Sequence, residues 1–130
     1  MAMKKGYKQL LAEADAQIRT LTVQEAIERH GGQEVVFVDL RDPRELDREG
    51  RMPGAFACTR GMLEFWIDPE SPYHKPIFAE RKHFIFFCAG GWRSALAAKT
   101  AQEMGLENVS HIEGGFTAWK KAGGPVEESA

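Results

Sequence analysis

The sequence contains no long apolar run, and this absence limits where the protein is expected to reside. A membrane-spanning helix needs roughly 20 consecutive apolar residues, and no stretch of the chain approaches that length. The amino end also lacks the apolar core of a secretory signal peptide. We therefore expect a cytoplasmic protein with no membrane partner.

Cysteine is scarce as well. The chain has two cysteines, Cys58 and Cys88, and they do not form a C-x-x-C pair, so a zinc site is not expected. The four histidines (His30, His74, His83 and His111) have no metal-ligand spacing either. We predict reduced thiols, as in the cytoplasm, and neither a metal nor another cofactor.

A strong excess of charge is also missing. The 130 residues include 17 Lys and Arg against 19 Asp and Glu, which gives a net charge of −2. Without a basic surface, nucleic acid is not an expected partner. Hydrophobic residues make up 43% and charged residues 28%, as in ordinary soluble domains. The length suits one domain with its own core.

What the sequence does contain is a strand, a cysteine, a glycine turn and a helix in direct succession. His83–Phe87 is an apolar run with three phenylalanines, which predicts a buried strand. Cys88 follows it, two glycines turn the chain, and residues 94–104 are rich in alanine and other helix formers. Ligands of α/β sheets bind at the carboxyl ends of the strands. The pattern therefore makes Cys88 a candidate site residue.

The residues after Cys88 are of the kind that favours a thiolate. Gly90 and Gly91 lack a β-carbon, so the loop can curl with its N–H groups pointing inward. The start of the helix adds further unpaired N–H groups, and Arg93 adds a positive charge. The thiolate is the nucleophilic form of cysteine. The alternative is that Cys88 is a small buried apolar residue, as free cysteines usually are.

Four segments together resemble one enzyme family. The loop Cys88-Ala89-Gly90-Gly91-Trp92-Arg93-Ser94 resembles the C-x-x-G-x-R-S active-site loop of the rhodanese-like sulfurtransferases. Val38-Asp39-Leu40-Arg41 resembles their V-D-x-R strand end. Gly50-Arg51-Met52-Pro53-Gly54-Ala55 resembles G-H-I-P-G-A, with Arg-Met in place of His-Ile. Gly114-Gly115-Phe116-Thr117-Ala118-Trp119 resembles the closing G-G-x-x-x-W. The likeness spans about residues 20–124.

Strands that alternate with helices predict an α/β fold with a mostly parallel sheet. The resemblance implies the rhodanese-like fold, a small central sheet with helices on both faces. We expect residues 1–20 to form a helical extension, residues 21–125 the rhodanese-like domain, and residues 126–130 a frayed acidic tail. Apolar residues at helical spacing in the extension indicate packing on its own domain, the simpler arrangement, or on a partner.

The resemblance also implies sulfur transfer through Cys88. The Cys88 thiolate attacks the outer sulfur of a small sulfane-sulfur donor, such as thiosulfate, a persulfide or a polysulfide. A thiol or cyanide-type acceptor, or a protein sulfur acceptor, then takes that sulfur from the Cys88 persulfide. The loop amides of Ala89, Gly90, Gly91, Trp92, Arg93 and Ser94 hold the charged sulfur. Arg93 either orients an anionic donor or braces the loop.

Asp39 and Arg41 follow the predicted strand at residues 35–38, on the same edge of the sheet as Cys88. We interpret them as a supporting charged pair that ties neighbouring loops, rather than as catalytic groups. Cys58 is interpreted as a core residue of a short strand.

The long segment between residues 61 and 82 has two interpretations. Trp66, Tyr73 or His74 could form a wall over the cysteine and shape the substrate entrance. Alternatively, Phe65 and Trp66 could close the edge of the core.

Three alternative functions stay open. Cysteine phosphatases and arsenate reductases resemble this chain in having a phosphate cradle, but their C-x5-R loop is one residue longer than the C-x4-R spacing here. A non-catalytic interaction module is disfavoured because inactive members of the family commonly lack the cysteine. A carrier that relays sulfur to one particular partner is compatible with the same residues.

Overall fold

A single five-stranded sheet forms the centre of the computed structural model, which describes residues 2–128. The strands are β1 (Arg19–Leu21), β2 (Val35–Asp39), β3 (Phe56–Ala57), β4 (His83–Phe87) and β5 (Val109–Ile112). Their order in the sheet is β1-β5-β4-β2-β3, and every pairing between these strands is parallel. The α/β class with a parallel sheet is thus confirmed, and β4 occupies its middle.

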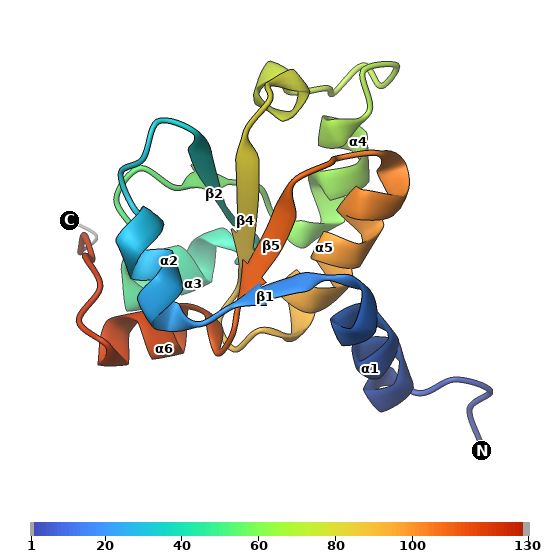
Figure 1. The fold of residues 1–130 in the computed structure, drawn as a ribbon, viewed down its shortest axis with the longest axis horizontal. Helices are drawn as coiled ribbons and strands as arrows, with labels where there is room; N and C mark the ends of the chain where they lie inside the picture. The colour runs from blue at the N-terminus through green and yellow to red at the C-terminus, as the bar shows by residue number, and fades with distance from the viewer. Residues whose placement is uncertain (1, 129–130) are drawn as a thin grey trace.

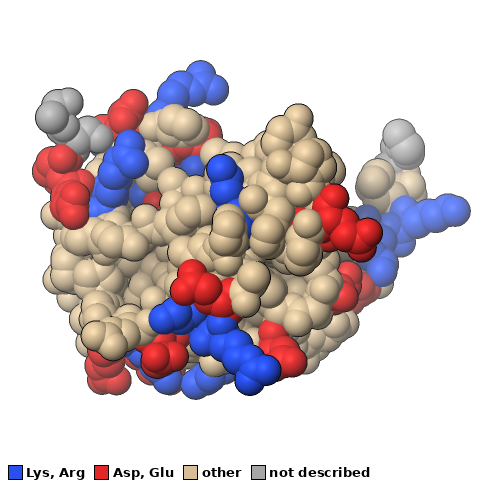
Figure 2. Space-filling model, turned by 90° about the horizontal axis from the view of Figure 1, so that it is seen from above, with Lys and Arg blue, Asp and Glu red and all other residues tan. Residues whose placement is uncertain are grey.

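Helices cover both faces of this sheet (Figure 1). On one face lie α1 (Tyr7–Gln17), α4 (Leu63–Ile67) and α5 (Trp92–Met104). On the other lie α2 (Val23–Arg29), α3 (Pro43–Glu49) and α6 (Gly115–Lys121). Two 3₁₀ turns, η1 (Arg60–Met62) and η2 (Pro76–Ala79), complete the described elements. Figure 2 shows the molecule from the top of Figure 1, with acidic and basic side chains interspersed on that face.

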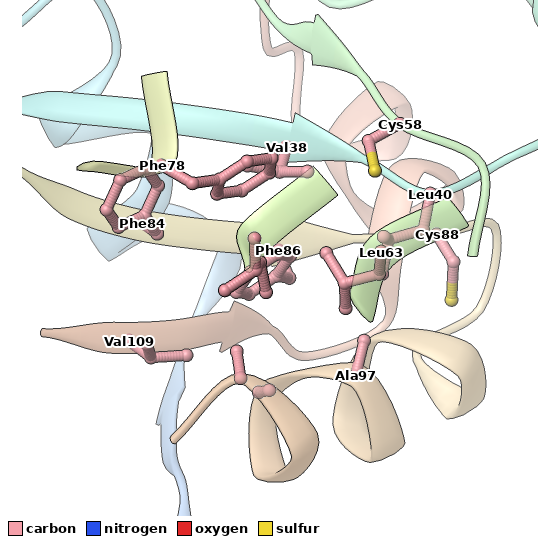
Figure 3. Packing of buried hydrophobic residues seen from close by; sticks show 13 residues of the cluster. Val38, Leu40, Cys58, Leu63, Phe78, Phe84, Phe86, Cys88, Ala97 and Val109 are labelled. Carbon is pink, nitrogen blue, oxygen red and sulfur yellow. The ribbon is translucent and has the colours of Figure 1, made fainter. Parts of the chain in front are cut away.

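Strand β4 divides the core between the two faces. Its five residues are all buried, and successive side chains of a strand point to opposite faces. Phe84 and Phe86, followed by Cys88, pack in the cluster on the α4 and α5 side (Figure 3). Ile85 and Phe87 pack in the cluster on the α2 and α6 side. This alternation decides that the Cys88 side chain faces α5.

Helix α3 begins directly after β2, and its start is held by a capping box. The Asp42 side chain accepts a hydrogen bond from the N–H of Glu45 (3.1 Å), and Glu45 Oε1 accepts one from the N–H of Asp42 (3.1 Å). Pro43 stands at the first helical position, which suits its fixed backbone angle. This cap places Glu45 at the edge of the sheet where β2 and β4 end.

The two ends of the chain are more firmly attached than expected. Residues 19–21 form the edge strand β1 beside β5, a strand that the sequence pattern does not show because it is three residues long with one buried side chain. At the other end, Glu127 and Arg51 exchange backbone hydrogen bonds of 2.8 Å. The frayed tail is therefore a wrong prediction as far as Glu127, while residues 129–130 lie outside the described part of the chain.

The extension packs on its own domain. Helix α1 lies against α5 (Figure 1), and the side-chain amide of Gln102 donates a hydrogen bond of 3.0 Å to the carbonyl of Gln17. The Tyr7 and Trp92 rings are 5.0 Å apart between centroids. Helix α1 therefore reaches the first residue of α5.

The part of the segment between β3 and β4 that carries Trp66, Tyr73 and His74 does not form a wall over the cysteine. The loop that leads to η2 lies at the amino end of β4, whereas Cys88 follows the carboxyl end (Figure 1). Trp66 packs on Phe56 with ring centroids 5.8 Å apart, at the edge of the core. The second interpretation is thus correct for Trp66 but wrong for Phe65, which is 54% exposed.

Candidate active site

Cys88 lies where four elements converge. It follows β4 and precedes α5 (Figure 3), and it is 1% exposed. The N–H of Leu40, just after β2, donates to the carbonyl of Phe87 (2.9 Å), which extends the parallel pairing up to the cysteine. The start of α6 contacts the loop from the other side. The position at the carboxyl edge of the sheet agrees with the general location of ligand sites in α/β folds.

The sulfur of Cys88 has two close hydrogen-bonding partners. The N–H of Gly91 donates to Sγ over 3.2 Å, and Sγ is 3.7 Å from Oγ of Ser94, to which the thiol can donate. Gly91 has φ +109°, a conformation that side chains disfavour. Gly90 has neither a positive φ nor a neighbour within 4 Å of an added β-carbon. Of the two glycines, Gly91 is therefore the one whose conformation favours glycine.

Helix α6 orients the first part of the loop. The N–H groups of Phe116 and Thr117 donate to the carbonyls of Cys88 (2.8 Å) and Ala89 (3.1 Å). A β-carbon on Gly115 would lie 2.4 Å from the Cys88 carbonyl oxygen, so this close approach requires glycine. Because these two carbonyls are bonded to α6, they are turned away from the inner side of the loop.

Arg93 is bound to a carboxylate. Its guanidinium donates two hydrogen bonds to Glu45, of 2.7 and 2.9 Å. The hydrogen bonds from Arg93 lower the pKa of Glu45 to about 2, against the opposing effect of burial, and Glu45 in turn raises the pKa of Arg93. Of the two expected roles for Arg93, this geometry supports bracing: the pair joins the loop to the start of α3.

Asp39 and Arg41 form a buried bidentate ion pair. The guanidinium donates to the two carboxylate oxygens over 2.9 and 2.7 Å, and to the carbonyl of Gly50 over 3.1 Å. Its carbon also lies 4.0 Å from the centroid of the Phe116 ring. The pair thus joins the end of β2 to the segment after α3 and to α6. This arrangement is the tie between loops that the sequence suggests, and Arg41 does not touch the sulfur.

Two hollows flank the loop. One, of about 350 Å³, is lined by Ala89 together with charged residues of α3 and α6. The other, of about 390 Å³, lies toward α1 and is lined by Gly90, Gly91 and His111, among others. Trp92, beside the loop, is 63% exposed. Hollows therefore lie on both sides of the loop, while the sulfur itself is buried.

Sequence reasoning missed three contributors to the site. Glu45 is recognisable as a capping residue, but nothing in the sequence pairs it with Arg93. Gly115 belongs to a quoted motif whose close approach to the loop only the fold reveals. His111, from β5, lies 2.9 Å from Ser94 Oγ through its Nδ1 atom, and its separation of 17 residues from Ser94 carries no local signal.

Across residues 2–128, no three His, Cys, Asp or Glu side chains gather so as to hold a metal ion. Over the same span, no helix has the length and apolar character to cross a membrane.

Two comparisons with known sequences point to the same family. The sequence model of the Rhodanese-like domain family matches residues 22–122. The chain is 30% identical over 102 residues to the thiosulfate sulfurtransferase GlpE of Pseudoalteromonas translucida (strain TAC 125), which covers 78% of this chain and 89% of that relative.

Solved structures agree in fold. A protein of unknown function from Rhodopseudomonas palustris CGA009, described as a possible tyrosine phosphatase, is 63% identical with a TM-score of 0.95, covering 98% of both chains. The polysulfide-sulfur transferase homodimer from Wolinella succinogenes is 26% identical with a TM-score of 0.72, covering 95% of this chain and 88% of the other. With the parallel sheet and the cysteine loop at its carboxyl edge, these similarities show that the chain belongs to the rhodanese-like domain family.

Proposed function

We propose that the protein is a sulfurtransferase that carries sulfane sulfur as a persulfide on Cys88. Membership of the family and the similarity to a sulfurtransferase support sulfur transfer as the general activity. The observation that carries the finer proposal is the position of the Cys88 sulfur. The sulfur lies at the start of α5 and accepts a hydrogen bond from the N–H of Gly91, and the loop contains no Asp or Glu that would repel its negative charge.

The reaction has two steps. The Cys88 thiolate attacks the outer sulfur of the donor, and a new S–S bond forms. The rest of the donor molecule leaves with the electron pair of the broken bond, as sulfite when the donor is thiosulfate. The acceptor nucleophile then attacks the terminal sulfur, and Cys88 leaves as a thiolate. Such covalent catalysis should show ping-pong kinetics. The N–H groups from Ala89 to Ser94 hold the terminal charge of the persulfide.

The charges of the loop favour a persulfide or polysulfide donor over thiosulfate. Arg93 is the single charged residue between Cys88 and Ser94, and its guanidinium is committed to Glu45. Little positive charge is therefore left for a dianionic donor. Exposed Trp92, packed on Tyr7, gives the rim an aromatic surface instead.

A phosphatase is the second candidate, because the similar protein from Rhodopseudomonas palustris is described as a possible tyrosine phosphatase. Two features of this chain disfavour it. The C-x4-R loop is one residue shorter than the phosphatase loop and suits one atom better than a phosphoryl group with three oxygens. The guanidinium of Arg93, which would have to hold the phosphate, is bonded to Glu45.

Intact-protein mass spectrometry tests these candidates together. The protein is exposed in parallel to thiosulfate, glutathione persulfide and an aryl phosphate, with Cys88→Ser as the control. We expect a mass gain of one sulfur atom on Cys88, larger with glutathione persulfide than with thiosulfate, and no phenol from the aryl phosphate. Release of phenol that depends on Cys88 would replace the sulfurtransferase proposal by the phosphatase.

A loop variant tests the argument from size. Inserting one glycine between Gly91 and Trp92 creates C-x5-R spacing and widens the ring of amides. Sulfur transfer should fall, and phosphate or arsenate should protect Cys88 from alkylation better than in the wild type. We also propose a cytoplasmic location, which is supported by the need of this function for a reduced thiol and by the free state of Cys58 and Cys88.

A further inference from the structure

A chain of hydrogen-bonding groups leads from the Cys88 thiol into the molecule. Sγ lies 3.7 Å from Oγ of Ser94, and this hydroxyl lies 2.9 Å from Nδ1 of His111. The three side chains come from the loop, α5 and β5, and are 1%, 0% and 4% exposed. Each group can both give and take a proton. Ser94 Oγ also lies 3.2 Å from the carbonyl of Gly91, to which the hydroxyl can donate. When the hydroxyl donates to His111 instead, the thiol has a continuous path for its proton to the imidazole.

The far side of the His111 ring is unusual. Its Nε2 atom is buried and makes no hydrogen bond within residues 2–128, although buried polar atoms are nearly always paired. The ring lines the hollow of about 390 Å³ beside α1, whose lining also includes Thr20, Asp15 and Glu113. The Nε2 atom itself has almost no exposed surface, so a water molecule must enter from this hollow before Nε2 can release a proton.

We propose that Ser94 and His111 form a proton relay that takes up the proton of Cys88 when its thiolate forms. The thiol passes its proton to Ser94 Oγ as the Ser94 hydroxyl proton moves to His111 Nδ1. The imidazolium then releases its Nε2 proton to water in the hollow. Ser94 now donates to the thiolate, and the Nδ1–H of His111 donates to Ser94. The proposal rests on the proposed function only in taking Cys88 as the nucleophile.

The charges around His111 suit this role. Burial lowers its pKa, so the ring is neutral at rest and can accept a proton; Asp15 from α1 and Glu113 after β5 act in the opposite direction and favour the imidazolium. Thr20 of β1 and Phe86 of β4 are its neighbours in the sheet and carry no charge. The other ionisable residue of the loop, Arg93, is bound to Glu45. Cys88 is therefore the ionisable group of the loop that exchanges a proton with the relay.

The pH profile of Cys88 alkylation by iodoacetamide tests the relay, with peptide mass spectrometry to separate Cys88 from Cys58. Ser94→Ala removes the hydroxyl. His111→Asn keeps a hydrogen-bonding group for Ser94 but cannot accept a proton. We expect each variant to slow alkylation at pH 6 by about tenfold, because the thiolate loses a hydrogen bond and its population falls. The slowing should be smaller at pH 9, where a larger fraction of the thiol is ionised in every variant. The double variant should be no slower than the slower single variant.

A second buried His–Ser pair is the matched control. His83 of β4 lies 2.7 Å from Ser110 of β5 through its Nε2 atom, at the amino end of β4. His83→Asn and Ser110→Ala remove a similar bond without touching Cys88. They should lower stability while leaving alkylation at pH 6 unchanged.

Two results would overturn the relay: unchanged low-pH alkylation in Ser94→Ala and His111→Asn, or an equal slowing in the control variants. Because alkylation needs no sulfur donor, these results are independent of whether the wild type forms a persulfide. Absence of persulfide would contradict the proposed function and leave the relay to be judged on alkylation alone.

Discussion

The two cysteines of this protein share nearly every property except their immediate surroundings. Cys58 follows β3 and Cys88 follows β4; they are 0% and 1% exposed, and they belong to the same core cluster. Figure 3 shows both in that cluster, on either side of Leu40. Composition and burial therefore do not distinguish a reactive thiol from an inert one here.

The difference lies in what each sulfur faces. The Cys58 thiol has a carbonyl, that of Thr59, at 3.8 Å, and burial raises its pKa to about 12. The Cys88 sulfur accepts from the N–H of Gly91 and lies at the start of the 13-residue helix α5. A carbonyl favours the thiol, whereas N–H groups favour the thiolate. Burial thus suppresses the ionisation of a thiol unless hydrogen-bond donors of the protein replace the water molecules that the sulfur loses.

The strongest test of this contrast exchanges each sulfur for oxygen. Cys88→Ser should abolish sulfur transfer, because a serine alkoxide is inaccessible near neutral pH, while the fold is retained. Cys58→Ser should transfer sulfur at nearly the wild-type rate. The measurement is turnover with thiosulfate or glutathione persulfide and cyanide, with circular dichroism to confirm folding. Activity that survives in Cys88→Ser but not in Cys58→Ser would reverse the assignment.

The second largest effect is expected in the alkylation rates of the two thiols in the native wild-type protein. With a pKa of about 12, roughly one Cys58 in 10⁴ is ionised at pH 8, and the side chain is buried as well. We expect iodoacetamide to modify Cys88 first, and Cys58 only when denaturant unfolds the protein. Equal modification rates in the native state would show that the surroundings of the two sulfurs do not control their reactivity.

Gly115→Ala should distort the loop around Cys88 without changing the sulfur itself. The added β-carbon would meet the Cys88 carbonyl at 2.4 Å, and Gly115 has φ +59°. We expect a stability loss of at least about 2 kcal/mol and slower sulfur transfer, measured by urea unfolding and turnover. Gly61→Ala is the matched control, because nothing lies within 4 Å of its β-carbon and its φ is not positive. A similar loss in both would disprove the role of the close approach.

The smallest expected effect concerns the brace between Glu45 and Arg93. Because the folded-state pKa of Glu45 is lowered to about 2, the pair stabilises the protein above the ordinary carboxyl range, and this stabilisation is lost as the pH falls from about 4.5 toward 2. Glu45→Gln should cost about 1 kcal/mol at pH 7 and progressively less as the pH falls toward 2, measured by urea unfolding. Gln still accepts the capping bond from the N–H of Asp42. A loss that does not depend on pH would assign the effect to packing.

Local signals in the sequence determined most of the elements that carry the site. The apolar run of β4, the alanines of α5 and the capping residues Asp42 and Glu45 act through neighbours a few positions away. Their effects can therefore be read without knowing the fold. The same holds for the order cysteine, glycine, helix, which identifies Cys88 as the candidate nucleophile, and for the close spacing of Asp39 and Arg41.

Tertiary structure alone decided which distant groups meet at that cysteine. Strand β1 is too short to show a pattern, and its hydrogen bonds come from β5. Glu45 reaches Arg93 across 48 positions, and His111 reaches Ser94 because β5 lies beside β4 in the sheet. Hydrogen bonds, ion pairs and steric contacts act over a few ångströms of space, whatever the separation in sequence. The parallel order of the strands therefore sets these partners, and it exists only once the chain has folded.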